Sequence, residues 1–213
     1  MELVTSFIDI VLHLDKHLAI LVQNYGIWVY ALLFAIIFME TGFVVTPFLP
    51  GDSLLFVAGA VAAAGGMDPL ILAATLITAA LCGDNVNYWT GRFLGPKVFQ
   101  FERNRWLKRE NLDRTHAFME RYGPKAIVIA RFVPLVRTFV PFVCGIGRLT
   151  YPRFLGFSLL GALLWVGLLV PAGYFFGNLP VVKNNLTAVI LLIVLLSIMP
   201  GIIEYIKHKR VAG

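Results

Sequence analysis

The sequence predicts an all-α membrane protein: an inverted repeat of a re-entrant helical hairpin plus a transmembrane helix, with an N-terminal amphipathic helix and a C-terminal transmembrane helix. Three observations lead to this prediction. Hydrophobic residues make up 59% of the 213 residues, charged residues only 14%, and the mean hydropathy is +0.81, whereas soluble domains are about half apolar. The apolar segments fall into two length classes. Charged residues also lie inside some of these segments, where burial is costly.

Three segments are long enough to cross a hydrocarbon core of roughly 30 Å, which takes about 20 apolar residues in a helix. They are 69–91, 153–177 and 185–206. The first carries Asp84 near its end but is still predicted to span the membrane.

The apolar segments around residues 40–52 are shorter. "IWVYALLFAIIFM" precedes Glu40 and "SLLFVAGAVAAA" follows Asp52; each is about a dozen residues, or ~18 Å as a helix, which is too short to cross. Between them lies the Pro- and Gly-rich stretch "ETGFVVTPFLPGD". We therefore expect residues 27–64 to form a re-entrant hairpin that enters the bilayer and returns to the same side.

The stretch "AIVIARFVPLVRTFVPFV" has the same form, and it predicts a second re-entrant hairpin over residues 125–147. Pro134 breaks the helix and re-aims the neighbouring Arg131 and Arg137. Charge placement favours a return over a crossing. The loop 96–121, the turn "GRLTYPR" and the C-terminal "KHKR" are all basic, and only a return leaves all three in the cytoplasm, where basic loops concentrate.

The hairpins and spans make two repeats, 25–95 and 122–178, within one integral membrane domain over 1–213. The repeats share a proline near the start of the span and the similar endings "TGRFLG" and "AGYFFG". The predicted topology inverts the second repeat relative to the first, an arrangement that in transporters places the substrate between the repeats near the midplane. We expect the first hairpin to open outside and the second inside.

Residues 1–24 are expected to lie along the external interface as an amphipathic helix, because their polar residues follow one helical stripe. The stripe consists of Thr5, Ser6, Asp9, His13, Lys16, His17, Gln23 and Asn24. The chain is thus predicted to be a multi-pass membrane protein with a cytoplasmic C-terminus.

The charges in the apolar segments are the candidate functional residues. A lone ion in a membrane costs about 2.5–3.5 kcal/mol even on permissive scales, and two hairpins meeting at their tips would bring Glu40 and Asp52 to Arg131 and Arg137. A structural interpretation stays open, in which Asp52 caps a helix and the arginines brace carbonyls or reach the interface.

Asp84, Tyr88 and Arg92 recur at four-residue spacing and share a helix face. They are supporting candidates, explained equally well by an ion pair near the interface or by a transport path.

The residue types suggest proton-coupled movement of an anionic head group. Arginine stays charged and its planar fork matches phosphate, so Arg131 and Arg137 are predicted to bind the head group. A carboxylate in a site of low dielectric constant can exchange protons near neutral pH, so Glu40 and Asp52 are predicted to couple protons.

At these residues the sequence resembles the DedA family of bacterial inner-membrane proteins, which shares the VTT domain with eukaryotic lipid scramblases. The resemblance rests on "ETG", "FLPGDSLLFVAGA", "GDNVNYWTGRFLG" and "ARFVPLVRTFVPFVCGIG" and covers most of the chain. It implies paired re-entrant hairpins and a flippase that moves undecaprenyl phosphate or a phospholipid between leaflets with dependence on the proton gradient. It also implies essential roles for Glu40, Asp52, Arg131 and Arg137.

Other functions stay open. A passive lipid scramblase or a proton or ion pathway that supports membrane homeostasis could use the same charges, and the mixed-charge loop 96–121 would suit a membrane assembly factor. An enzyme is not expected, because there is no HExxH or GxSxG motif and no histidine lies in a hairpin or span. We expect an anionic lipid, protons and the bilayer as partners, and no nucleic acid, cofactor or metal. The sequence leaves a homo-oligomer open.

Overall fold

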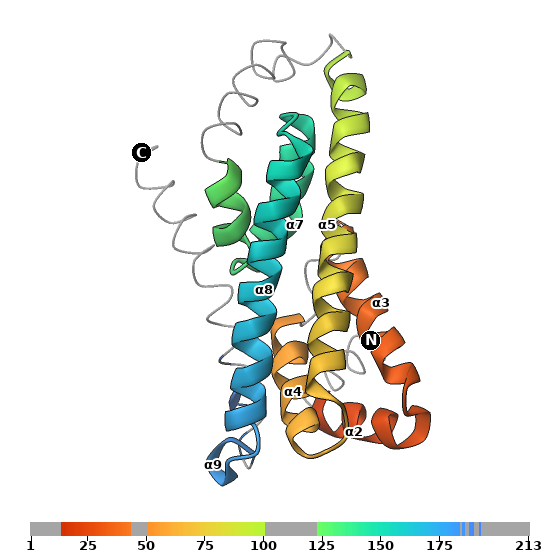
Figure 1. Cartoon of the computed structure of the whole chain (residues 1–213), viewed down its shortest axis with the longest axis vertical. Coiled ribbons are helices and arrows are strands. Elements are labelled where there is room, and N and C mark those ends of the chain that lie inside the picture. Colours follow the sequence, from red (N-terminus) through yellow and green to blue (C-terminus); the bar gives the residue numbers. More distant parts are fainter. Residues whose placement is uncertain are drawn as a thin grey trace, which may run out of the picture. The chain divides into compact units, whose positions relative to one another are not determined.

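The computed structural model describes residues 14–43, 51–100 and 123–183, together with 185, 188, 189 and 192, and in these residues it contains helices and turns and no strand. This confirms the all-α class. In chain order the helices are α2 (Leu14–Tyr25), α3 (Trp28–Gly42), α4 (Gly51–Ala63), α5 (Pro69–Gln100), α7 (Pro134–Ile146), α8 (Tyr151–Phe176) and the short α9 (Pro180–Lys183) (Figure 1). Residues 123–130 are also helical.

Two helices have the length and apolar character of membrane spans, Pro69–Leu94 of α5 and Tyr151–Phe176 of α8. Each has 26 residues, or about 39 Å at 1.5 Å per residue, which exceeds a hydrocarbon core of roughly 30 Å. They match two of the three predicted crossings. The third, 185–206, lies outside the described residues except for 185, 188, 189 and 192. Residues 1–13 of the predicted amphipathic helix and 101–121 of the predicted basic loop also lie outside them.

Helix α5 continues past the predicted end of its span at residue 91 and runs to Gln100. The apolar length of a segment sets how much of it fits in lipid, but a helix can continue into polar surroundings, where charged side chains are hydrated. The start of α5 is set by a cap. Asp68 Oδ1 accepts hydrogen bonds from the amides of Leu70 (2.8 Å) and Ile71 (2.9 Å), which satisfies two of the four free N–H groups at a helix start.

The other apolar helices are short. Helix α3 has 15 residues, and α4 and α7 have 13 each, so each extends only about 20 Å. The proline break predicted in the second hairpin is present. The helix over 123–130 ends in a turn, Val133 has extended backbone (φ −123°, ψ 107°), and α7 begins at Pro134, where the missing N–H of proline removes no helical hydrogen bond.

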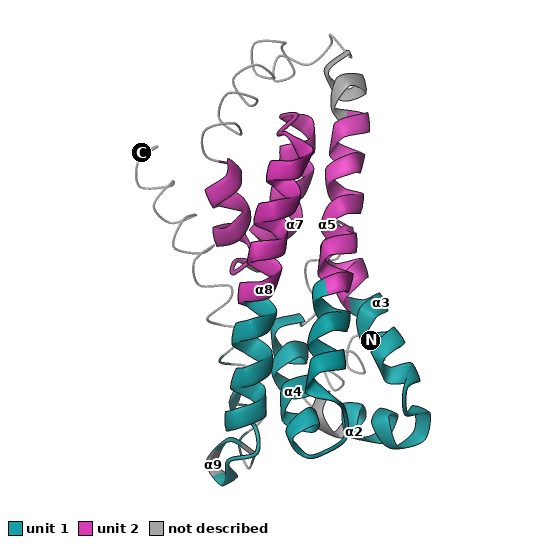
Figure 2. Ribbon diagram, in the orientation of Figure 1, with its two compact units in different colours: residues 1–36, 49–77, 165–213 teal, residues 37–48, 78–164 magenta. Residues whose placement is uncertain are grey.

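The chain divides into two compact units (Figure 2). Unit 1 comprises residues 1–36, 49–77 and 165–213, and unit 2 comprises residues 37–48 and 78–164. Helices α3, α5 and α8 contribute residues to both units.

Unit 1 is organised around α4, which packs against α2 and the second half of α8. Ten of its residues are buried, from Gly51 to Ala62, as expected for a helix that is apolar on all sides. Close approach to α8 depends on glycine. A Cβ on Gly173 would lie 1.9 Å from the Phe56 carbonyl oxygen, and a Cβ on Gly59 would lie 2.2 Å from that of Val170.

Unit 2 repeats this contact between α7 and α5. A Cβ on Gly91 would lie 2.1 Å from the Phe142 carbonyl oxygen, and a Cβ on Gly145 would lie 2.0 Å from that of Tyr88. The sequences correspond, because "FVAG" of α4 and "FVCG" of α7 each supply a phenylalanine carbonyl and a glycine, and "AGYFFG" and "TGRFLG" each supply the opposing glycine. In each unit a short helix therefore crosses a long one through the same small-residue contact, the type that lets membrane helices approach closely.

The crossing contact in unit 1 gives a stability prediction. Replacing Gly173→Ala should lower the free energy of unfolding by about 1–3 kcal/mol or more, because the added methyl overlaps backbone atoms that cannot rotate away. Gly167→Ala in the same helix is the matched control. A Cβ there meets nothing within 4 Å, so its stability should stay the same or rise by up to about 1 kcal/mol. Thermal unfolding in detergent measures both, and equal midpoints for the two variants would contradict the packing described.

Candidate functional site

Four charged residues among the predicted site residues lie buried in unit 2. The exposed fractions of Glu40, Asp84, Arg131 and Arg137 are 0%, 2%, 4% and 6%. Arginine stays protonated and positively charged in proteins. Two permanent positive charges at this depth therefore need anionic partners, and the structure supplies them as two ion pairs.

The first pair joins Glu40 to Arg137, whose Nη2 donates to Glu40 Oε1. Glu40 lies in the last turn of α3, and Arg137 lies in the first turn of α7, which begins at Pro134. The position of the helix start therefore sets where the guanidinium lies. The contact joins the two predicted hairpins, as expected from the charges alone.

The second pair joins Arg131 to Asp84 on α5, with 2.5 Å between Arg131 Nη1 and Asp84 Oδ2. Arg131 lies in the turn between the helix over 123–130 and α7. The same carboxylate oxygen accepts a hydrogen bond of 2.5 Å from the hydroxyl of Ser158 on α8. Asp84 was only a supporting candidate from the sequence, and Ser158 was not a candidate.

A buried amide holds the segments that carry the first pair. Asn87 Nδ2 donates to the carbonyl oxygen of Thr41 (2.6 Å) and to that of Thr138 (3.1 Å). These residues directly follow Glu40 and Arg137 in the chain. Asn87 is 2% exposed, so both bonds are shielded from solvent, and the residue connects α3 and α7 through α5.

Close packing supports this connection. A Cβ on Gly83 would lie 1.9 Å from Thr41 Oγ1, and a Cβ on Gly42 would lie 3.3 Å from Gly83 Cα. The last turn of α3 therefore lies directly on α5 and brings the Glu40 backbone to the level of Asn87.

Asp52 belongs to unit 1, in the first turn of α4, where a negative charge is favourable near the helix N-terminus. It is half-buried, and its Oδ1 accepts a 2.8 Å hydrogen bond from Nε1 of Trp165 on α8. The sequence did not indicate Trp165, because an isolated tryptophan in an apolar span is usually a packing residue.

The remaining supporting residues form a separate contact in unit 2. Arg92 Nη1 donates to the Tyr88 hydroxyl at 3.1 Å, and that hydroxyl donates to the Leu149 carbonyl oxygen at 2.6 Å. The Tyr88 ring also stacks on Phe154, with 4.4 Å between ring centroids. Tyr88 thus holds the turn that follows α7, and Arg92 binds the Tyr88 hydroxyl. Asp84 instead faces Arg131, so the three residues of the predicted stripe have two different roles.

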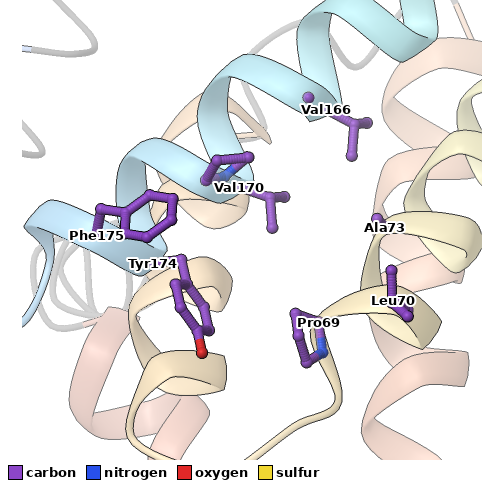
Figure 3. A pocket seen from close by; sticks show the side chains of 9 residues that line it. Pro69, Leu70, Ala73, Val166, Val170, Tyr174 and Phe175 are labelled. Atoms are coloured by element: carbon purple, nitrogen blue, oxygen red, sulfur yellow. The ribbon is translucent and has the colours of Figure 1, made fainter.

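Unit 1 also contains an apolar cavity of about 270 Å³ between the start of α5 and the second half of α8. Figure 3 shows its wall, which is formed by Pro69, Leu70, Ala73, Val166, Gly167, Val170, Pro171, Tyr174 and Phe175. No candidate site residue lines it. Its wall has no charged side chain, so the cavity offers a surface for hydrocarbon and no charged partner for a phosphate.

Comparison with known proteins identifies the family. Residues 49–175 match the VTT domain. The chain is 52% identical over its full length to protein DedA of Escherichia coli K12, covering 98% of that protein. The chain belongs to the DedA family.

Other relatives of this DedA-family chain are named as membrane proteins. An uncharacterized membrane protein of Mycobacterium leprae is 42% identical, with 79% of this chain and 75% of that protein covered. Inner membrane protein YghB of Escherichia coli K12 is 37% identical, with 80% and 78% covered. No solved structure matches the chain. The chain is therefore an inner-membrane protein, in agreement with its composition.

The Glu40–Arg137 pair can be tested by its coupling energy. Arg137→Gln alone should lower stability by about 3–5 kcal/mol, because it leaves a buried carboxylate without its guanidinium. Adding Glu40→Gln should recover part of this loss, so the two single effects should not sum in the double variant. Thermal unfolding of the four proteins measures the coupling. Arg148→Gln, which changes an exposed arginine in the same unit, should alter stability by less than about 0.5 kcal/mol. Additive effects of the two buried changes would show that the side chains do not interact.

Proposed function

We propose that this DedA-family protein is a lipid flippase that moves an anionic lipid, such as undecaprenyl phosphate or a phospholipid, between the leaflets of the inner membrane in exchange with protons. It catalyses no covalent reaction in this proposal. The observation that carries it is the burial of two arginines, each paired with a carboxylate from another segment, inside a unit made of apolar helices.

The pairs suit transport because each guanidinium already has an exchangeable anionic partner. An arginine paired with a carboxylate can take a phosphate in its place, since both anions accept its planar N–H groups in the same way. A pair made for stability alone is a poor explanation, because well-packed apolar residues of similar volume usually stabilise a protein as well or better.

Proton coupling follows from the same exchange. When Glu40 takes up a proton, its attraction for Arg137 weakens and the guanidinium becomes available to phosphate; loss of the proton restores the ion pair and expels the head group. Asp52 is the second proposed proton carrier. Its bond to the Trp165 indole would weaken on protonation, since a neutral carboxyl accepts a hydrogen bond less strongly than a carboxylate.

The predicted membrane architecture completes the proposal. Helices α3, α4 and α7 are too short to cross a bilayer, which supports re-entrant hairpins over 27–64 and 125–147. The equivalent glycine contacts of α4 with α8 and of α7 with α5 support an inverted repeat. In such a transporter the substrate would bind near the midplane, with the C-terminus in the cytoplasm.

The proposal is tested by lipid translocation in proteoliposomes, with undecaprenyl phosphate and common phospholipids as separate substrates. Arg131→Ala/Arg137→Ala should slow translocation at least tenfold, because each lost charge-assisted hydrogen bond contributes about 1.5–3 kcal/mol and 1.4 kcal/mol is a factor of ten. Arg148→Ala removes an exposed arginine of the same unit and should translocate at the wild-type rate.

The pH gradient separates the flippase from passive alternatives. An imposed gradient should accelerate translocation by the wild type, and an ionophore should abolish this acceleration. Translocation that persists unchanged with the ionophore would indicate a passive scramblase. Equal rates for the wild type and the double arginine variant would reject both functions for this site.

A further inference from the structure

The carboxylate of Asp84 is held in the manner of a bound anion. Two donors converge on one of its oxygens, Oδ2, at 2.5 Å each: Arg131 Nη1 and Ser158 Oγ. The three residues come from α5, from the turn after residue 130, and from α8. Asp84, Arg131 and Ser158 are 2%, 4% and 0% exposed, so the cluster is enclosed.

The donor set is one that also recognises phosphate. Arginine supplies a fixed positive fork, and a serine hydroxyl rotates to donate to whichever anionic oxygen is present. We propose that Arg131 and Ser158 bind the phosphate group of the transported lipid and that Asp84 is an internal anion which this phosphate displaces. The inference rests on the proposed function, and it adds Ser158 as a ligand and Asp84 as a competitor.

The surroundings of Arg131 fit this role. Ser158 and Gly161 are three residues apart on α8, so they lie on one face of the helix. A Cβ on Gly161 would lie 3.2 Å from Arg131 Cδ, so the missing side chain leaves space for the arginine stem beside α8. Arg131 therefore lies beside a helix face that offers a hydroxyl at Ser158 and no side chain at Gly161.

A carrier of a charged lipid must neutralise its binding site when the lipid has left. An internal anion that competes with the phosphate does this. A buried arginine without an anion is strongly unfavourable, so an empty site must be neutralised before the protein can return. Asp84 provides this neutralisation because it is fixed to α5 beside the site. It also limits affinity, since a phosphate must replace it, and a carrier that binds too tightly cannot release its substrate.

The test is a binding measurement in detergent with dodecyl phosphate as the lipid-phosphate probe. Asp84→Asn should bind it at least tenfold more tightly than the wild type, because the competing charge is gone. Ser158→Ala should bind several-fold more weakly, and Ser158→Thr, which keeps a hydroxyl, should restore binding. Asp68→Asn is the matched control: it removes an equal charge at the N-cap of the same helix and keeps a capping side chain, so affinity should not change.

Inorganic phosphate distinguishes the two sources of the group. Inorganic phosphate should displace dodecyl phosphate, and the variants should rank in the same order of affinity for both. It should bind more weakly than dodecyl phosphate, because the natural ligand is a lipid. If Asp84→Asn raises the affinity for inorganic phosphate but not for dodecyl phosphate, the assignment of a lipid ligand is overturned. The proposal is rejected if Asp84→Asn binds dodecyl phosphate no more tightly than the wild type and the Ser158→Ala and Ser158→Thr variants have equal affinities. That result would show that the cluster is purely structural.

Unfolding midpoints without ligand and lipid translocation are measured on the same preparations. A structural brace predicts that Asp84→Asn loses both stability and affinity, whereas the proposal predicts a gain in affinity whatever the change in midpoint. Tighter binding without any translocation by the wild type would reject the flippase but keep the binding site. Normal translocation with unchanged affinities would reject only the site.

Discussion

The structure of unit 2 depends on the neutralisation of two arginines that cannot lose their charge. Arg131 and Arg137 are buried among apolar helices, and each needs an anion at contact distance because an unpaired buried charge is strongly destabilising. Glu40 at the end of α3 and Asp84 within α5 supply these anions. The ends of α3 and α7, the turn at 131–133 and the middle of α5 are therefore constrained to meet.

The backbone packing makes this meeting geometrically feasible. Glycines let α3 lie on α5 and let α5 lie on α7 at distances that any side chain would prevent. Asn87 then donates to the carbonyl groups beside Glu40 and Arg137 and fixes the two segments in register. In the proposed transport cycle, anion exchange at these arginines breaks a few polar contacts and leaves the glycine crossings intact, because the two sets of interactions involve different atoms.

The main helices, the break at Pro134 and the residues of the first ion pair could be predicted from the sequence. The length of an apolar segment, the position of a proline and a charge within apolar sequence are local signals. The pairing of Arg131 with Asp84 could not be predicted in this way. Periodicity shows that Asp84, Tyr88 and Arg92 share a face of α5, but not which segment packs on each part of that face. Ser158, Asn87 and Trp165 gave no usable signal, since single polar groups in apolar helices gain meaning only from the neighbour they contact.

The central claim is that Glu40 and Arg137 meet inside the protein, and cysteine cross-linking in native membranes tests it most directly. In a chain with Cys82→Ala and Cys144→Ala, the pair Glu40→Cys/Arg137→Cys should form an intramolecular link with a short thiol-reactive cross-linker in most molecules. The pair Glu40→Cys/Arg148→Cys is the control and should remain unlinked, since Arg148 lies beyond the far end of α7 from Arg137. Failure of the first pair to link, or equal linking of both pairs, would contradict the account.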